Sequence, residues 1–343
     1  MISLNNEPCC VCGETRSLLV QETTYPEHGY PGSFRLRKCG KCGLLFNSPR
    51  LDEKELADLY GQNYYFFNRA DAKELARIVP MYARTVALVT DEIANKRCLD
   101  VGCGRGYFPA VLNELGWDAH GVEISSEASG YARQRFGLEH IFTGTIEQYA
   151  ASDLAQRFGL VTAIDVIEHV PSPDSFIAAL AKVVEDNGLL IIDTPNAAAY
   201  NIKVNGESWQ GFNPFHIYLF TILNLRQLLA KHGFHVEQSF SYNNLPADLT
   251  PPTTARKLRM KALDTARLLG VARPLARIYF NLASRPNPAH RKLDVPTMVK
   301  QAAEMARSAP TYLKTPDAEE PLAREATGDN IVVIARRRAA HAP

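Results

Sequence analysis

The chain has 343 residues, 38 Lys and Arg against 37 Asp and Glu, and 46% hydrophobic residues. This apolar content is sufficient for one large or two modest cores, and the balanced charge argues against a general nucleic-acid binder. No stretch approaches the roughly 20 apolar residues of a membrane span, and no apolar segment follows a basic N-terminal region. A cytoplasmic protein without a signal peptide is therefore predicted.

Two Cys-x-x-Cys pairs stand near the N-terminus, each followed by a glycine that permits a tight turn. Four thiolates at this spacing suit a tetrahedral zinc ion, with a hairpin of residues 16–20 and 33–37 between the pairs. A redox dithiol needs only one such pair, and disulfides need an oxidising compartment. Cys10 could replace one ligand, but only Cys9 repeats the spacing of the second pair. Residues 1–47 are thus predicted to form a small zinc ribbon, with the ligands Cys9, Cys12, Cys39 and Cys42.

Residues 48–96 are predicted to form a helical connector. A short helix over 51–60 and a long helix over 70–95 flank an aromatic cluster at 64–67. The aromatic side chains either belong to the core, which is the simpler interpretation, or supply a tyrosine that covers a ligand.

A glycine-rich turn follows the connector. An apolar run reaches Asp100 and then Gly102, Gly104 and Gly106, and the next apolar run, 117–123, ends in Glu123. Glycines let the backbone leave a strand in a tight turn and approach a ligand without interference from Cβ. A carboxylate at the end of the second strand would face the same crevice and accept hydrogen bonds from ribose hydroxyls.

The spacing of these glycines distinguishes two nucleotide-type cofactors. A dinucleotide site needs Gly-x-Gly-x-x-Gly, whereas this turn reads Gly-x-Gly-x-Gly. Asp100 would repel a pyrophosphate but suits the amino and sulfonium groups of S-adenosylmethionine. The turn resembles motif I of class I S-adenosylmethionine-dependent methyltransferases, and Glu123 matches the ribose-binding acid of that family. Cys98 and Cys103 flank the turn and are interpreted as small buried apolar residues.

The rest of the core alternates apolar runs with helical segments, as in a doubly wound sheet. The resemblance implies a mostly parallel, seven-stranded, Rossmann-like methyltransferase sheet built from residues 97–245 and 328–338. It places Glu147 near the adenine and assigns Asp165 to the cofactor site. After the first two strands, strands are expected at 138–142, 158–165, 188–193, 234–242 and 328–336, with helices at 174–185 and 221–232.

Two histidines are candidates for catalysis. Methyl transfer to a hydroxyl or a carbon acid needs a group that takes a proton, and histidine is suited to this near neutral pH. His216 lies in the loop after the fifth strand and is predicted to be the general base, with Tyr218 orienting it or the substrate; a role in capping the next helix is equally open. His169 belongs to a Glu-His-Val-Pro signature that resembles the group including quinone-biosynthesis O-methyltransferases, where it either shapes the loop or takes part in catalysis.

The whole arrangement resembles bacterial methyltransferases of sugar-nucleotide and polysaccharide pathways, including deoxysugar C-methyltransferases with an N-terminal zinc-binding domain. The resemblance covers residues 1–242 and 328–338. It implies a saccharide acceptor linked to a nucleotide or a lipid. In the C-methyltransferase pattern a glutamate precedes the histidine, and here Phe215 takes that place. O-methylation is therefore favoured over C-methylation.

Residues 246–327 are predicted to form a basic helical insertion and a linker between strands six and seven. From 254 to 293, ten Lys or Arg stand against Asp264 alone, with apolar residues at helical spacing. A lid with a solvated face is the simplest interpretation, and the alternatives are contact with an anionic membrane surface, a phosphate-bearing substrate or nucleic acid. Residues 310–327 are interpreted as the return linker.

Three classes of function remain open at this point. The favoured one is a methyltransferase acting on a saccharide or a related small molecule. An RNA methyltransferase is disfavoured because the ribbon has few basic residues. A non-catalytic zinc-ribbon interaction protein is disfavoured because Asp100, the three glycines and Glu123 are all intact.

Overall fold

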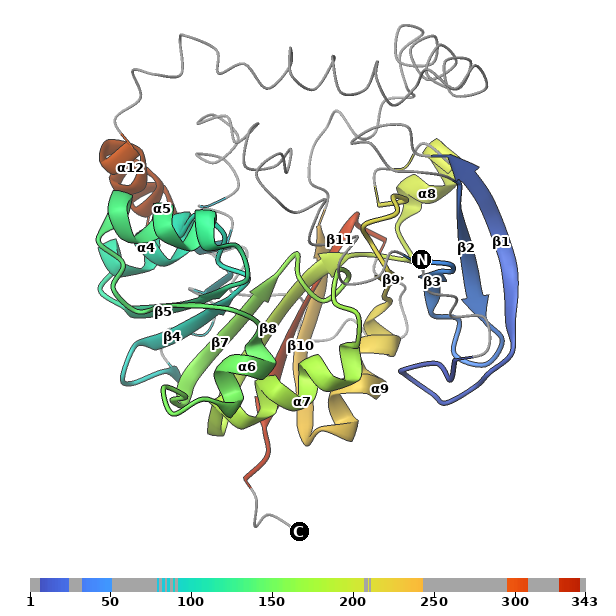
Figure 1. Ribbon diagram of the computed structural model, residues 1–343, viewed down its shortest axis with the longest axis horizontal. Coiled ribbons are helices and arrows are strands. Elements are labelled where there is room, and N and C mark those ends of the chain that lie inside the picture. The colour runs from blue at the N-terminus through green and yellow to red at the C-terminus, as the bar shows by residue number, and fades with distance from the viewer. Residues whose placement is uncertain are drawn as a thin grey trace, which may run out of the picture.

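The computed structural model describes residues 7–24, 33–50, 79, 82, 83, 85, 86, 89, 92–206, 209, 211–242, 295–307 and 327–339. These residues form two β-sheets and the helices that cover the larger one (Figure 1). The larger sheet has the strand order β10-β11-β8-β7-β4-β5-β6. Its strands in chain order are β4 (Arg97–Val101), β5 (Asp118–Glu123), β6 (Ile141–Thr143), β7 (Phe158–Ile164), β8 (Val184–Pro195), β10 (Phe234–Tyr242) and β11 (Asn330–Arg337).

Strand direction follows the prediction. Strands β4 to β8 run parallel to one another, and β11 pairs antiparallel with both β8 and β10. The predicted doubly wound, mostly parallel, seven-stranded sheet is thus confirmed. Because the strand order reverses at β4 and β7, their carboxyl ends flank the crevice where open α/β sheets bind ligands.

Successive side chains along the central strands point to opposite faces of the sheet, and each face is covered by a layer of helices. Leu99 and Val161 belong to the core shared with α6, α7 and α9, whereas Cys98 and Leu160 belong to the core shared with α4, α5 and α12. Figure 1 shows these two groups of helices on opposite sides of the sheet. The helices are α4 (Tyr107–Glu114), α5 (Ser126–Phe136), α6 (Ile146–Ala151), α7 (Pro173–Val183), α8 (Tyr200–Asn205), α9 (Ile222–Lys231) and α12 (Val295–Arg307).

Several boundaries differ from the prediction; the strand expected at 138–142, for example, is observed as β6 at Ile141–Thr143. The clearest difference is at the junction of α7 and β8. The helix expected over 174–185 ends at Val183, and β8 begins at once with Val184, which pairs with Phe158. The register then shifts, and Asn187 adopts a φ of 62°. Asparagine tolerates this left-handed conformation better than most residues, so an irregularity here lets the strand begin earlier than the apolar run.

Several predicted segments lie outside the described residues. They are the helix at 51–60, the aromatic cluster at 64–67, the basic stretch at 254–293, and most of both the helix at 70–95 and the linker at 310–327. Within the predicted insertion, the described residues 295–307 form α12, which packs against α4. None of the described helices is long and apolar enough to cross a bilayer.

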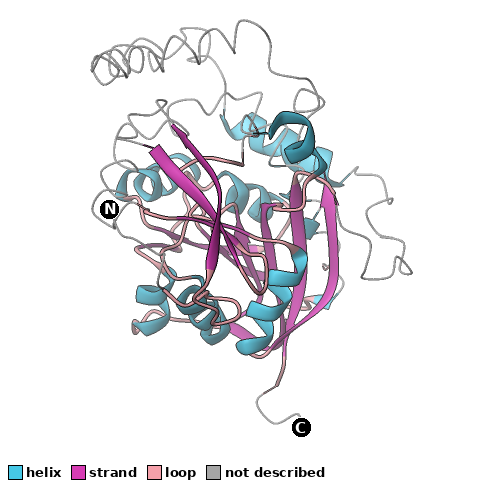
Figure 2. Ribbon diagram, turned by 90° about the vertical axis from the view of Figure 1, so that its right-hand side faces the viewer, coloured by secondary structure: helices cyan, strands magenta, loops and turns pink. Residues whose placement is uncertain are grey.

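The smaller sheet is antiparallel, with the order β1-β2-β3-β9. The expected hairpin is confirmed, because β1 (Ser17–Thr24) pairs with β2 (Ser33–Cys39). The sheet continues through β3 (Leu45–Asn47) to β9 (Tyr218–Leu219), a strand that the sequence did not predict. Seen from the side of β1 and β2, this sheet stands in front of the core (Figure 2). A segment of the core therefore completes the N-terminal sheet.

The third glycine of the turn is required by packing. Gly106 caps the N-terminus of α4 with a φ of 77°. A Cβ atom there would lie 2.7 Å from Cβ of Ala132 in α5 and 2.6 Å from Cδ1 of Leu138. Gly137, at the C-terminus of α5, has a similar φ of 66° but open space around it.

This contrast predicts different costs for the same substitution. Gly137→Ala should cost about 1 kcal/mol of stability, through backbone strain alone. Gly106→Ala should cost about 1 to 3 kcal/mol more, because overpacking adds to the same strain. Urea unfolding of the two variants measures the difference, and equal losses would show that the close approach to α5 does not matter.

Candidate functional site

The glycine turn is fixed to the neighbouring strand by its backbone. The amides of Gly102 and Cys103 both donate to the carbonyl of Val122, at 2.8 and 3.1 Å. Gly102 has a φ of 78°, and a Cβ atom there would lie 2.5 Å from Cγ2 of Val166. Asp100, just before the turn, is buried and accepts a 2.7 Å hydrogen bond from Oγ1 of Thr162. Burial raises the pKa of Asp100 to about 7.

Glu123 ties the turn to the end of β5. Its Oε2 accepts the amide of Gly104 at 2.8 Å, and its Oε1 accepts the amide of Ser125 at 2.7 Å. The side chain is only 6% exposed, and this burial raises its pKa against the opposing effect of the two amides. A carboxylate oxygen can accept more than one hydrogen bond, so Glu123 can hold the turn and also accept hydroxyl groups.

The other two residues assigned to the cofactor lie on neighbouring elements. Glu147 is exposed in the first turn of α6, beside a capping box of Thr145 and Gln148. Asp165 follows β7 with a φ of 53° and accepts a 2.9 Å hydrogen bond from the hydroxyl of Tyr82. Both therefore lie beyond the carboxyl ends of their strands, whereas Asp100 and Glu123 belong to the last residues of β4 and β5.

A buried polar network that the sequence did not reveal adjoins Asp165. The carboxyl of Asp193, at the end of β8, accepts the hydroxyl of Tyr242 at 2.7 Å and Nδ2 of Asn330 at 3.2 Å. The same amide lies 3.5 Å from Asp165. Burial raises the pKa of Asp193 well above its ordinary value. The available signal was the position of Asp193 in the sequence. The two strands predicted at 158–165 and 188–193 end in Asp165 and Asp193.

Glu168 lies between this network and the two histidines. It is fully buried, and its Oε2 accepts Oγ1 of Thr194 at 2.9 Å. Its Oε1 lies 3.7 Å from Nε2 of His169. Burial, together with the nearby Asp165 carboxylate, raises the pKa of Glu168 well above its ordinary value.

Backbone carbonyls fix the tautomers of both histidines. Nδ1 of His169 lies 2.9 Å from the carbonyl of Phe215, and Nδ1 of His216 lies 2.9 Å from the carbonyl of Gly211. A carbonyl can only accept, so we assign the proton of His169 to Nδ1. Nδ1 of His216 also lies 3.2 Å from Nδ2 of Asn213, which is a donor, and we assign the proton to this Nδ1 because the carbonyl of Gly211 is the nearer partner. Nε2 of each ring is then left as an acceptor. The rings meet edge to face with centroids 4.8 Å apart. Burial lowers the pKa of His169 to about 4 and, with the neighbouring His169, that of His216 to about 3.

The structure also bears on two predictions for the loop after β8. His216 does not cap the next helix, because Thr221 is the N-cap of α9. Tyr218 lies on β9, and its phenol is buried within electrostatic reach of the Arg50 guanidinium. Burial raises the pKa of Tyr218 above its ordinary value. Its role in orienting His216 or the substrate stays a prediction.

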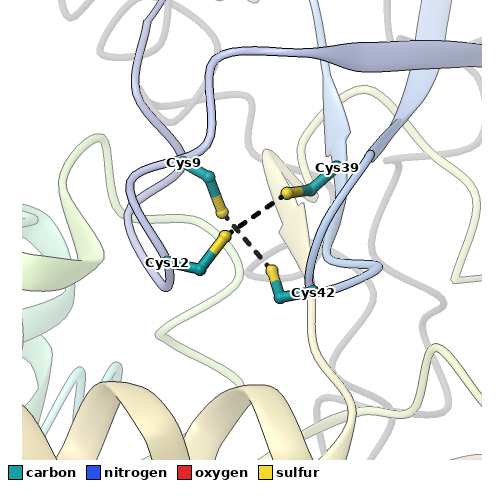
Figure 3. Close-up of side chains that lie close together, drawn as sticks. All are labelled: Cys9, Cys12, Cys39 and Cys42. Atoms are coloured by element: carbon teal, nitrogen blue, oxygen red, sulfur yellow. Dashed lines mark hydrogen bonds between the residues drawn. The ribbon is translucent and has the colours of Figure 1, made fainter.

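The four predicted zinc ligands converge from two turns (Figure 3). Sγ of Cys9 lies 3.6 Å from Sγ of Cys42, and Sγ of Cys12 lies 3.5 Å from Sγ of Cys39. All four sulfur atoms lie within 4.8 Å of one another, and Cys10 is not among them. Zinc–sulfur bonds of about 2.3 Å place tetrahedral ligands about 3.8 Å apart, so the cluster fits a zinc ion.

Among the described residues, two further groups have ligand atoms close enough to share a cation. Glu168, His169 and His216 form one of them, inside the candidate active site. The other consists of Asp118, His120 and His140, at the end of β5 opposite Glu123.

Comparisons with known proteins bear on the family of the chain. Residues 67–239 match a family model described as a methyltransferase domain. A ubiquinone biosynthesis O-methyltransferase from Aromatoleum aromaticum is 30% identical over 197 residues, covering 54% of this chain and 72% of that protein. A ubiquinone biosynthesis O-methyltransferase from Burkholderia vietnamiensis is 37% identical over 108 residues. That match covers 30% of this chain and 46% of that protein, so it spans about half the length of this relative. A solved SAM dependent methyltransferase from Archaeoglobus fulgidus is 15% identical, with a TM-score of 0.47, covering 80% of this chain and 98% of that one.

The lowered pKa of His216 predicts a pH-dependent contribution to stability. As pH falls below the ordinary value of 6.5, the unfolded chain binds a proton that the folded protein does not bind until about pH 3. The wild type should therefore lose about 1 to 2 kcal/mol between pH 7 and pH 5 that His216→Gln does not lose. Urea unfolding at both pH values tests this, with exposed His235→Gln keeping the wild-type loss. Equal losses in wild type and His216→Gln would contradict the assignment.

Proposed function

The chain belongs to the methyltransferase-domain family, and on that premise we propose that it methylates a hydroxyl of a small molecule, preferably a nucleotide- or lipid-linked saccharide. The observation that carries the proposal is the neutral histidine pair, which supplies the base that such a transfer needs. His169 and His216 each direct a protonated Nδ1 to a carbonyl and keep Nε2 as an acceptor, beside the carboxyl of Glu168. A neutral base at the carboxyl edge of the sheet is what deprotonation of a hydroxyl requires.

The residues of the turn would hold the methyl donor. S-adenosylmethionine supplies an electrophilic methyl group on a sulfonium centre. Glu123 would accept the ribose hydroxyls, and the glycines would let the backbone approach the ligand. Asp100 lies just before the turn in the sequence. A cationic ligand there would stabilise its ionised form, which burial alone disfavours. Glu147 and Asp165 are proposed as further contacts because they lie beyond the carboxyl ends of β6 and β7, the strands that flank β5 and β4.

His216 can remove the acceptor proton although its pKa is low. A hydroxyl oxygen that receives a methyl group becomes an oxonium, which is far more acidic than the alcohol. A weak base is therefore sufficient if it takes the proton as the new bond forms. A base with a pKa of about 3 also stays unprotonated across the working pH range. His169 lies edge to face against His216 and is proposed to hold that ring in place.

Two observations bear on the acceptor. Phe215 stands where the sugar C-methyltransferases carry a glutamate, and the named relatives are O-methyltransferases, so both favour oxygen. The four-cysteine cluster beside a methyltransferase core supports the saccharide. The names of the relatives support a second class, a hydroxylated precursor of a quinone. Transfer of labelled methyl groups from S-adenosylmethionine to nucleotide sugars and to hydroxylated quinone precursors separates the two classes.

Two variants should separate cofactor binding from turnover. Glu123→Gln should weaken S-adenosylmethionine binding at least tenfold, because hydrogen bonds to a charged acceptor contribute about 1.5 to 3 kcal/mol. His216→Asn should leave binding unchanged and lower kcat by about 100-fold or more, within the usual range for a general base. Calorimetry measures binding, and labelled methyl transfer measures kcat. Full turnover by His216→Asn would show that His216 is not the base.

We also propose that the four-cysteine cluster holds a structural zinc ion. The sulfur separations match a tetrahedral site, and four thiolates leave no open position for a substrate. Zinc would join the turn before β1 to the turn between β2 and β3, and so stabilise the N-terminal sheet.

Neighbouring cysteines provide a matched test of the zinc site. Cys9→Ser should remove the bound zinc, since one of four thiolates is lost, whereas Cys10→Ser should keep one zinc ion per chain. Elemental analysis of the purified proteins measures the metal. Loss of zinc from both variants, or from neither, would contradict the assignment of the ligands.

A further inference from the structure

The N-terminal sheet and the loop that carries His216 share a hydrogen-bonded strand pair. Leu45 and Phe46 of β3 pair with Leu219 and Tyr218 of β9. The backbone amide of Asn47 extends this pairing by donating to the carbonyl of Ile217 at 2.8 Å. The last residues of the N-terminal sheet therefore lie directly against the backbone that follows His216.

The side chain of Asn47 contacts the same loop. It is 2% exposed, and its Nδ2 donates to the carbonyl of Asn213 at 3.0 Å and to the carbonyl of His216 at 2.8 Å. From the other side, Oδ1 of Asn213 accepts the amides of Phe215 and His216, at 3.0 and 3.1 Å. The side-chain amide of Asn47 thus holds the carbonyls of Asn213 and His216, at the two ends of this tight turn.

We propose that Asn47 is a positioning residue for methyl transfer, which fixes the backbone of His216 so that its Nε2 faces the acceptor. This inference rests on the proposed role of His216 as the base. Asn47 would act only through the turn, because its side chain donates to the backbone carbonyls of Asn213 and His216. A displacement of about 1 Å at a reacting group can cost about 100-fold in rate, so a loosened turn would lower turnover without weakening cofactor binding.

The four-cysteine cluster is connected to this contact by a short path. Cys39 and Cys42 form the turn between β2 and β3, where the amide of Cys39 donates to the carbonyl of Leu44 at 2.9 Å. Leu44 and Phe46 are buried in the same core as Ile217. The position of β3, and with it Asn47, thus depends on the folded N-terminal segment.

Asn224 offers a matched control. It is also buried, at 1% exposed, and its Nδ2 donates to the carbonyl of Cys42 at 3.0 Å. It therefore joins the N-terminal segment to α9 by the same kind of hydrogen bond, but it does not contact the turn of His216. Its Oδ1 accepts from Thr221, and an aspartate would keep that acceptor.

The test compares Asn47→Asp with Asn224→Asp in the full-length protein. Both substitutions remove one amide donor and place a carboxyl against backbone carbonyls. We expect Asn47→Asp to lower kcat about 10- to 100-fold with an unchanged Kd for S-adenosylmethionine and unchanged zinc content. We expect Asn224→Asp to lower the unfolding midpoint and keep kcat. Asn47→Ser, which keeps one donor, should recover part of the rate, and it replaces Asn47→Asp if that variant does not fold.

A spectroscopic measurement distinguishes positioning from a general loss of structure. In protein labelled at histidine Cε1, the resonances of His216 and His169 should shift in Asn47→Asp and stay unchanged in Asn224→Asp. Full kcat in Asn47→Asp, or equal losses of kcat in both variants, would overturn the proposal. If His216→Asn retains full turnover, the general base is wrong, and the histidine resonances alone then decide whether Asn47 positions that ring.

Discussion

Carboxyl groups buried at one edge of the sheet set the main physical constraint on this protein. Asp100, Glu123, Glu168 and Asp193 are all at most 6% exposed, at the carboxyl ends of the central strands or just beyond them. A buried carboxyl is costly unless donors surround it. Those donors are the amides of the glycine turn, the hydroxyls of two threonines and a tyrosine, and the amide of Asn330. The turn, the strand ends and the start of β11 are therefore fixed by the same requirement.

The N-terminal sheet adds a second layer of constraint at this edge. Its last strand takes a partner from the loop after β8, and Asn47 holds the turn that precedes that partner. Loops that carry functional residues need a rigid support, because a base acts only from a narrow range of positions. Here the support comes from residues more than 160 positions earlier in the chain. In the mechanism that we propose, the cysteine cluster therefore acts on the base only through packing, at a distance from the reacting atoms.

The parts of the site that could be predicted are those encoded locally. Glu123 and Gly104 are 19 positions apart and belong to one strand–turn–helix–strand unit, so spacing and residue type were sufficient. The alternation of apolar runs likewise gave the sheet, and the paired cysteines gave their cluster. Asp193 meets Asn330 across 137 positions, and Asn47 meets His216 across 169. Such contacts depend on strand order and on a two-residue strand, β9, which has no periodicity to detect.

The same burial explains why this edge favours a cationic cofactor. Burial raises the pKa of Asp100 to about 7, and burial together with neighbouring carboxylates raises the pKa values of Glu168 and Asp193 well above their ordinary values. The two histidines provide no positive charge that would favour ionised carboxyls, because their own burial keeps them neutral. A positively charged ligand lowers the free energy of every ionised carboxyl near it. The sulfonium of S-adenosylmethionine is such a ligand, whereas a pyrophosphate would add to the repulsion.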